Sequence, residues 1–347
     1  MGGLDRADRA SVNRADRADR VINEAENKIE YKPKPAWLID SSIYVYNAWH
    51  SSKHDSKHGS GHQHNNLEKI DIHGNPINAV YGFLEFVYRL LSIEKPELIA
   101  FAFDETLKTS HRKQIYPQYK ANRTPAPASL RRQFQYCRQF LRAFGLYEDA
   151  SFYYEADDLI GTWAKSLREQ HIPVNIITAD KDLAQLVYEE DCWWEYERGQ
   201  RLDSKAISKK FKAKPHQIAD QLAIAGDKSD NIPGVPGIGM STAGKLLRKF
   251  DNLENLLASI AEISTMQIRG AAHIQQLIEE HQETIQLARQ LTGIKCNIEE
   301  IQISNFKISP INKDALSQLF IELDLSDETQ DKWLNLHKET LIKSNYF

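Results

Sequence analysis

Three short apolar runs in the first half of the chain each end in an aspartate; they cover residues 36–40, 98–104 and 174–180. Between them, residues 79–91 and 159–167 carry apolar side chains at the three-and-four spacing of an amphipathic helix. Continuous apolar runs that alternate with such helices are typical of buried parallel strands. The pattern therefore predicts an α/β fold, with a mostly parallel sheet flanked by helices.

The aspartates that end these runs form the first candidate site. The carboxyl ends of parallel strands meet at one edge of a sheet, where ligands bind in such folds. Asp40, Asp104 and Asp180 fall at that edge, and Asp182 follows closely. A single strand-final aspartate is more often a helix cap than a ligand. Several of them converging on one edge favour a site over capping.

The predicted helix that begins near Ala156 carries three acids around its first turn, Glu155, Asp157 and Asp158. A helix N-terminus stabilises each carboxylate by only about 0.3–1 kcal/mol, which does not comfortably offset their mutual repulsion. Acidic first turns are nevertheless common, so this segment alone favours plain capping. Together with the strand-final aspartates it favours a bound divalent cation, which would offset the repulsion.

Residues 108–142 contain nine basic side chains and no acidic one, although the net charge of the chain is −4. Prolines break the first half, which predicts a helical piece, a bend and a second helix. A charge run usually forms a solvated face. This run starts just after Asp104 and contains aromatic rings, so it favours a positive wall for a phosphate backbone, with rings for base stacking. The basic residues are Lys108, Arg112, Lys113, Lys120, Arg123, Arg131, Arg132, Arg138 and Arg142, and the rings include Tyr116 and Tyr119.

A glycine-rich turn occupies residues 226–239. We expect a helix to end near its start and Ser241 or Thr242 to cap the next helix. Gly237 and Gly239 would let the backbone approach a ligand, and the free amides of the following helix suit a phosphate oxygen. Beyond residue 250 the pattern predicts mostly helices and no chemistry.

Composition narrows the class of protein. The 347 residues, 41% of them apolar, suffice for one large domain or two ordinary ones. No apolar run approaches the ~20 residues of a membrane span, and the N-terminus lacks an apolar signal core, so we expect a cytoplasmic protein without membrane contact. Cys137, Cys192 and Cys296 are widely spaced, which argues against a disulfide framework and a structural zinc site.

Two polar segments carry no predicted site. Residues 1–35 contain a near-repeat of Asp-Arg-Ala, which predicts a disordered or loosely helical tail. Residues 51–71 contain four histidines, and their glycines weaken any helix that would align them. A mobile surface loop is therefore favoured over a transition-metal site. The histidines are His54, His58, His62 and His64.

With these motifs in place, residues 37–325 resemble the bacterial 5′-nuclease family, which is the 5′–3′ exonuclease domain of DNA polymerase I and its stand-alone relatives, kin to the flap endonucleases. The motifs are Asp40-Ser41-Ser42 with Tyr46, residues 116–123, Tyr154 to Asp158, Asp180 to Leu183, and Gly226 to Gly239. The resemblance implies a PIN-like twisted sheet, a helical arch and a C-terminal helix-three-turn-helix subdomain. No polymerase domain follows, so we expect a stand-alone nuclease.

The resemblance also implies boundaries and residue roles. The boundaries are a tail at 1–35, a nuclease core at 36–200 with its arch at 105–145, a helical subdomain at 201–325 and a tail at 326–347. One metal ion would be held by Asp40, Asp104, Glu155 and Asp157, and a second, partly through water, by Asp158, Asp180, Asp182, Asp227 and Asp230. The scissile phosphate would be steered by Arg112, Lys113, Lys120 and Arg123, of which Arg112 and Lys113 would offset its charge. DNA would also meet Tyr46, stacked on the terminal base, Tyr116 and Tyr119. The duplex backbone would be gripped, often with K⁺, at Gly234, Gly237, Gly239, Ser241 and Thr242.

The implied activity is that of a 5′–3′ exonuclease and 5′-flap endonuclease that hydrolyses DNA and RNA-primer phosphodiesters in replication and repair. Carboxylate oxygens suit two Mg²⁺ ions, or Mn²⁺, and do not select zinc or copper. The implied partners are DNA with 5′ flaps, nicks or single-strand ends, and RNA primers, bound by a monomer.

Two other functions compete with this one. A single-strand ribonuclease of the related PIN type is shorter and lacks the glycine turn with its second helix. A catalytically silent DNA-binding module would keep the basic segment without the metal ions. Every required ligand position is an acid, which argues against a silent module.

Overall fold

The computed structural model describes residues 33–54, 69–105, 109–301 and 306–344. Pro35–Phe347 forms one compact unit, separate from Met1–Lys34. Most of the predicted tail, most of the histidine-rich segment and Lys108 lie outside the described residues. Since residues 35–347 cluster together, the boundary expected at residue 200 stays a prediction.

A six-stranded sheet lies at the centre of this unit, in the order β3-β2-β1-β4-β5-β6. All neighbouring strands are parallel except β5 and β6, which are antiparallel. The mostly parallel α/β sheet predicted from the apolar runs is confirmed. The strands are β1 (Ala36–Asp40), β2 (Ile99–Asp104), β3 (Tyr147–Ser151), β4 (Val174–Ile177), β5 (Cys192–Glu195) and β6 (Gln200–Leu202).

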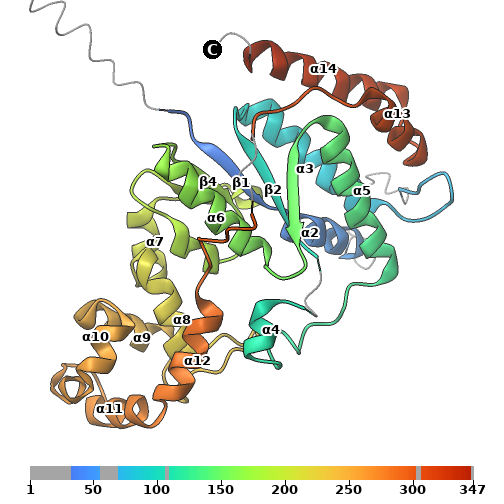
Figure 1. Ribbon diagram of the computed structural model, residues 1–347. Helices are drawn as coiled ribbons and strands as arrows, with labels where there is room; N and C mark the ends of the chain where they lie inside the picture. The colour runs from blue at the N-terminus through green and yellow to red at the C-terminus, as the bar shows by residue number, and fades with distance from the viewer. Residues whose placement is uncertain (1–32, 55–68, 106–108, 302–305, 345–347) are drawn as a thin grey trace, which may run out of the picture. The chain divides into compact units, whose positions relative to one another are not determined.

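Helices cover both faces of the sheet, because alternate side chains of each strand point to opposite sides. Trp37 and Ile39 pack into one core with α2 (Ser41–His54), α3 (Asn78–Glu94) and α5 (Ala128–Phe144). Leu38 packs into a second core with α6 (Ala156–Glu169) (Figure 1). This layering explains why β1 and β2 read as continuous apolar runs.

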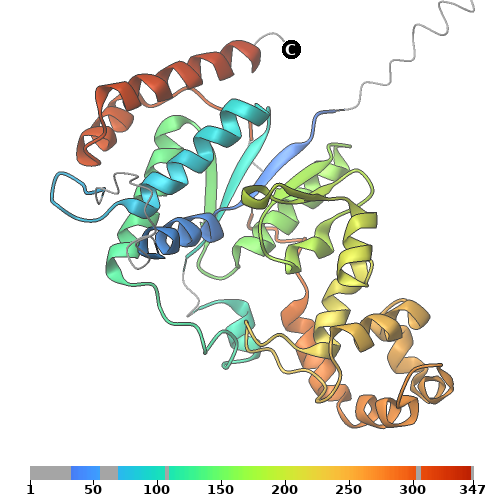
Figure 2. The same cartoon turned by 180° about the vertical axis from the view of Figure 1, so that it is seen from behind.

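The chain between residues 204 and 292 is helical and has its own core, which includes Leu246, Leu256 and Ile285. Tyr119, from the basic segment, also belongs to this core. Figure 2 shows these helices from behind. They are α7 (Ser204–Phe211), α8 (Ile218–Ala225), α9 (Met240–Phe250), α10 (Leu253–Ala258), α11 (Ala271–Glu280) and α12 (Gln282–Thr292). The 3₁₀ turns η3 (Pro215–Gln217) and η4 (Ile260–Thr265) lie in the same region, and short helices elsewhere are α4 (His111–Ile115), η1 (Asp182–Leu186) and η2 (Tyr196–Arg198).

The C-terminal residues differ from the tail that we expected at 326–347. They form α14 (Asp327–Ser344), which follows α13 (Lys313–Glu322). Trp333 is buried against Phe140 and Phe144 of α5, with ring centroids 4.7 and 5.2 Å away. The sequence obscured this helix because its apolar stripe is short and most of its positions are polar. None of the described helices is long and apolar enough to cross a membrane.

We expect Trp333→Ala to lower the free energy of unfolding by about 3–5 kcal/mol, because it removes a buried indole between α14 and α5. Urea denaturation measures this change. Asn335→Ala, at an exposed position of the same helix, is the control and should change it by less than about 0.5 kcal/mol. A Trp333→Ala protein as stable as the wild type would show that α14 does not dock as described.

Candidate metal and nucleic-acid site

Five predicted ligands lie together at the carboxyl edge of the sheet. Asp40 and Asp104 end β1 and β2, Asp157 lies in the first turn of α6, and Asp180 and Asp182 follow β4. Asp157 is half-buried, and its carboxyl feels the charges of Asp180, Asp40 and Asp104. The structure therefore brings together acids from four separate segments of the chain.

Hydrogen bonds fix this edge. The Thr178 hydroxyl donates to Asp40 Oδ2 at 2.8 Å and accepts from the Asp180 amide at 2.8 Å. The Asp182 amide donates to Asp180 Oδ1 at 2.8 Å. On the other side, Asp104 Oδ1 accepts the Ala156 amide at 3.0 Å. The carboxylates are thus held by neighbouring backbone.

Nearby cations only partly balance the charge of the clustered acids. Burial, together with the charges of Asp104 and Asp180, raises the pKa of Asp40. Burial and the charge of Asp180 likewise raise the pKa values of Asp157 and Asp182. Asp104 is exposed at its surface, but desolvation by the surrounding protein also raises its pKa. A divalent cation among these oxygens would relieve the repulsion, so the donor set fits a hard metal ion.

The clustered acids fit a hard metal ion by their charge and by their oxygen donors, and not by a completed coordination geometry. Among the described residues, no group of three or more His, Cys, Asp or Glu side chains is arranged to hold a metal ion. Individual oxygens are nevertheless open. Buried Glu155 Oε1 and Asp182 Oδ1 make no hydrogen bond, although Lys181 Nζ lies 3.6 Å from the latter.

Cations from the basic segment neutralise other predicted ligands. Burial alone would raise the pKa of Glu155, but Lys120 and Arg112 outweigh it and lower that pKa to about 2. Lys120 Nζ donates to Glu155 Oε2 at 2.6 Å, and the Tyr119 hydroxyl donates to the same oxygen at 3.0 Å. Glu155 therefore keeps only Oε1 without a partner.

Asp158 and Arg112 form a fully buried bidentate ion pair. The two guanidinium nitrogens donate to the two carboxylate oxygens at 2.6 and 2.8 Å. The amides of Glu155 and Lys295 donate to the same carboxylate. Both oxygens of Asp158 are thus occupied, and Arg112 is only 2% exposed.

Asp227 and Asp230 lie in the loop after α8 and also have cationic partners. Lys181 Nζ donates to Asp227 Oδ2 at 2.7 Å, and Arg123 pairs with Asp230. The Lys120 amide donates to the Asp230 carbonyl at 2.8 Å, so the basic segment is tied to this loop. These two acids therefore belong to a network that joins the sheet to the helical region.

These pairs correct part of our expectation for the basic segment. We expected Arg112, Tyr119 and Lys120 to face DNA, but all three are buried because they satisfy carboxylates inside the protein. A single sequence gives no sign of which acid each cation will meet. Lys113, Arg123 and Tyr46 remain at least partly exposed. Tyr116 is partly buried against the helical core.

The second half of the predicted arch also differs. Residues 128–144 form α5, whose apolar face packs on the sheet. Its arginines are engaged: Arg138 and Arg142 pair with Glu148, and Arg132 lies 3.6 Å from Asp71. Within the described part of the predicted arch, residues 109–127 therefore cross from the sheet to the helical region, and residues 128–144 do not.

The glycine turn is compact at its start and open at its end. A Cβ on Gly234 would meet the Gly226 nitrogen at 2.2 Å, so only glycine fits there. A Cβ on Gly239 would meet nothing within 4 Å. The cap differs from our expectation: Gly239 is the N-cap of α9, which places Ser241 and Thr242 within its first turn. The amides at this helix start are thus left without a side-chain cap.

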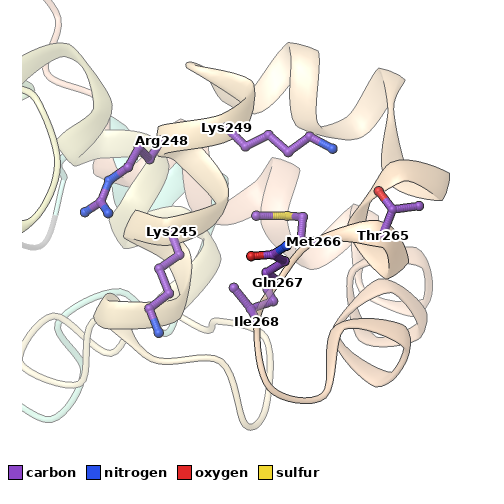
Figure 3. A pocket seen from close by; sticks show the side chains of 7 residues that line it. All are labelled: Lys245, Arg248, Lys249, Thr265, Met266, Gln267 and Ile268. Atoms are coloured by element: carbon purple, nitrogen blue, oxygen red, sulfur yellow. The ribbon is translucent and has the colours of Figure 1, made fainter.

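A basic groove continues from this turn, and our sequence reasoning missed it. The groove has a volume of about 600 Å³ and lies between α9 and residues 265–268. Lys245, Arg248 and Lys249 line one side of it (Figure 3). Lys249 also pairs with Glu262 at 3.1 Å. The signal was the spacing of three and four, which places basic side chains on one face of a helix.

Two family models match the chain. The N-terminal resolvase-like domain of the 5′-3′ exonucleases matches residues 35–212, and their C-terminal SAM fold matches residues 213–314. DNA polymerase I of Bacillus caldotenax is 35% identical over 251 residues, which are 71% of this chain and 28% of that protein. DNA polymerase I of Pseudomonas aeruginosa is 35% identical over 299 residues, or 86% of this chain and 31% of that protein. The chain spans less than a third of these polymerases.

A shorter relative matches over most of its length. The 5′-3′ exonuclease of Buchnera aphidicola subsp. Acyrthosiphon pisum is 32% identical over 268 residues, which are 77% of this chain and 88% of that protein. The T5 5′-exonuclease with bound zinc has a TM-score of 0.55 at 17% identity, covering 89% of this chain and 99% of that one. The catalytic core of Rad2 in complex with DNA substrate has a TM-score of 0.54 at 14% identity, covering 87% and 91%. At these identities the two structures show the shared fold.

The domain matches cover the sheet and the helical region in order, and the Buchnera relative extends over nearly the same span. The chain therefore belongs to the 5′-3′ exonuclease family.

Proposed function

We propose that this protein is a divalent-metal-dependent 5′-3′ exonuclease and 5′-flap endonuclease. The observation that carries the proposal is the cluster of mutually repelling carboxylates at the sheet edge. The name of the Buchnera relative supports the activity. A pseudo-enzyme-product complex of the T5 flap endonuclease with DNA and metal ions shares the fold, with a TM-score of 0.55 at 16% identity.

The first metal ion of the proposal would be held by Asp40, Asp104, Asp157 and the open Oε1 of Glu155. A second would be held by Asp180 and Asp182, with Asp227 and Asp230 acting partly through water. We propose Mg²⁺ or Mn²⁺, because carboxylate oxygens suit hard cations. Such ions activate a water and stabilise the leaving 3′ oxygen in phosphodiester hydrolysis.

The protein's own residues would bind and orient the substrate. Lys113 and Arg123 are the cations of the basic segment that we propose for the scissile phosphate, because Arg112 and Lys120 are buried in ion pairs. Tyr46 is 38% exposed and would stack on the terminal base. We expected Asp158 to bind a metal ion and Arg112 to bind the phosphate. Because they pair with each other, we propose instead that they position α4 against α6.

Duplex backbone would bind at the glycine turn, the first turn of α9 and the basic groove beyond it. Open amides and exposed Lys245 and Arg248 offer phosphate contacts there. The proposal includes K⁺ at this turn. The proposed substrates are DNA with 5′ flaps, nicks or single-strand ends, and RNA primers, cut by a monomer in the cytoplasm.

The direct test is cleavage of a 5′-flapped duplex. We expect the purified protein to cut near the junction with Mg²⁺ and to stop in EDTA. Asp157→Asn should retain DNA binding and lose at least about 10³-fold in kcat, because it removes a metal ligand of the transition state. Asp314→Asn, an acid in the first turn of α13, is the matched control and should cut normally. Unchanged cutting by Asp157→Asn would refute the site.

The raised pKa values of Asp40, Asp157 and Asp182 also predict a pH dependence of stability without metal. Near neutral pH these carboxyls hold protons in the folded protein, whereas in the unfolded chain they are ionised. The free energy of unfolding therefore falls as pH rises through their folded pKa values. Between about pH 6 and about pH 8 we expect metal-free protein to lose on the order of 1–3 kcal/mol. Mg²⁺ should restore it most at the higher pH. Thermal denaturation of the wild type and of Asp157→Asn at both pH values measures this loss of stability. The variant should lose less, and an equal loss in the two proteins would contradict the prediction.

The role of Arg112 is tested by stability. Arg112→Met leaves Asp158 buried and unpaired, so we expect the free energy of unfolding to fall by about 3–5 kcal/mol. Arg123→Met removes an exposed partner and should cost no more than about 1 kcal/mol. The double variant Arg112→Met/Asp158→Asn should recover part of the first loss. If Arg112→Met loses activity with full stability, Arg112 acts on the substrate instead.

A further inference from the structure

Two aromatic side chains stand exposed beside the carboxylate cluster. Phe152 is 68% exposed and Tyr153 is 40% exposed. They lie between β3 and α6, just before Glu155. The strand register places Ser151, the preceding residue, opposite Asp104. The pair is therefore adjacent in the fold to two of the proposed metal ligands.

The loop that carries these rings is held in place by hydrogen bonds. The amides of Tyr153 and Tyr154 both donate to Ser151 Oγ at 3.1 Å. The Thr109 hydroxyl donates to the Phe152 carbonyl at 2.5 Å, and the His111 amide donates to the Tyr153 carbonyl at 2.9 Å. The Phe152 ring is thus presented to solvent by a fixed backbone.

The second ring, Tyr153, is tied to the basic segment. The Tyr153 hydroxyl donates to Gln114 Oε1 of α4 at 3.3 Å, and its ring meets Tyr154 edge-on at 4.9 Å. Figure 1 shows this loop, between β3 and α6, on the side of the sheet where α4 lies. Lys113, proposed above for a phosphate, is the neighbour of Gln114 in the same helix. The exposed aromatic surface therefore lies between the carboxylate edge and a positive helix.

We propose that Phe152, held by the hydrogen-bonded backbone of its loop, stacks on an unpaired nucleobase of the strand whose phosphate lies at the carboxylate cluster. The inference rests on the proposed nuclease function. A fixed ring can stack on the face of any base, and its exposure leaves that face free. The ring would act as a positioning residue for a nucleotide other than the one assigned to Tyr46, which projects from α2.

The test compares flap substrates that are intact or lack one base. Affinity is measured in EDTA, so that no cutting occurs, and KM and kcat are measured with Mg²⁺. We expect Phe152→Ala to weaken binding of the intact flap about 5- to 150-fold, the range for loss of one stacked base. The effect should lie in KM more than in kcat. Phe152→Trp should bind like the wild type.

The abasic substrates identify the partner. At one flap position, we expect loss of the base to weaken binding by the wild-type protein as much as Phe152→Ala weakens binding of the intact flap. The same abasic substrate should bind to Phe152→Ala no more weakly than the intact flap does, because the stacking contact is already lost. Tyr188→Ala is the matched control: its ring is 64% exposed but lies over Arg168, at the far end of α6. It should leave binding unchanged.

The possible failures are distinct. If Phe152→Ala binds the intact flap as tightly as the wild type, the stacking inference is wrong. It is also wrong if, at every abasic position, the loss of affinity from the missing base adds in full to the loss from Phe152→Ala. A wild type that cuts no flap overturns the proposed function, while the EDTA binding data still decide the stacking. An unchanged melting temperature of Phe152→Ala shows that any loss of binding is local.

Discussion

The structure depends on how negative charge is buried at one edge of its sheet. Parallel strands and the start of α6 bring carboxylates from distant parts of the sequence into a poorly solvated space. Buried charges are costly unless they are paired. Glu155, Asp158, Asp227 and Asp230 obtain that pairing from lysines and arginines of the protein. Asp182 has only the more distant Lys181, at 3.6 Å. Among the described residues, Asp40, Asp104, Asp157 and Asp180 form no such ion pair, and the proposed metal ions would balance their charge.

The same pairing holds the parts of the protein together. Arg112 joins α4 to α6 through Asp158, and it also donates to the Leu291 carbonyl of α12. Lys120 and Arg123 join the basic segment to the loop after α8. The glycine turn and the carboxylate edge are therefore linked through one electrostatic network, which fixes the proposed duplex-binding turn relative to the proposed metal site.

Much of this could be predicted from local sequence. Apolar runs ending in Asp40 and Asp104 located two strands and the acids at their ends, because a buried parallel strand has a distinctive pattern. The partners of the basic residues could not be predicted, because Arg112 and Asp158 are 46 residues apart and only folding brings them together. Trp333 was missed because a few apolar residues in a mostly polar segment are a weak signal. Phe152 was missed because exposure is a tertiary property.

Calorimetric titration of the metal-free protein with Mg²⁺ near neutral pH, in buffers of different ionisation enthalpy, tests the central claim most directly. Carboxyls whose pKa values are raised by burial and repulsion hold protons that a metal ion must displace. The account predicts saturable binding with proton release, and a smaller release for Asp157→Asn. Binding without proton release, or equal release by the variant, would contradict it.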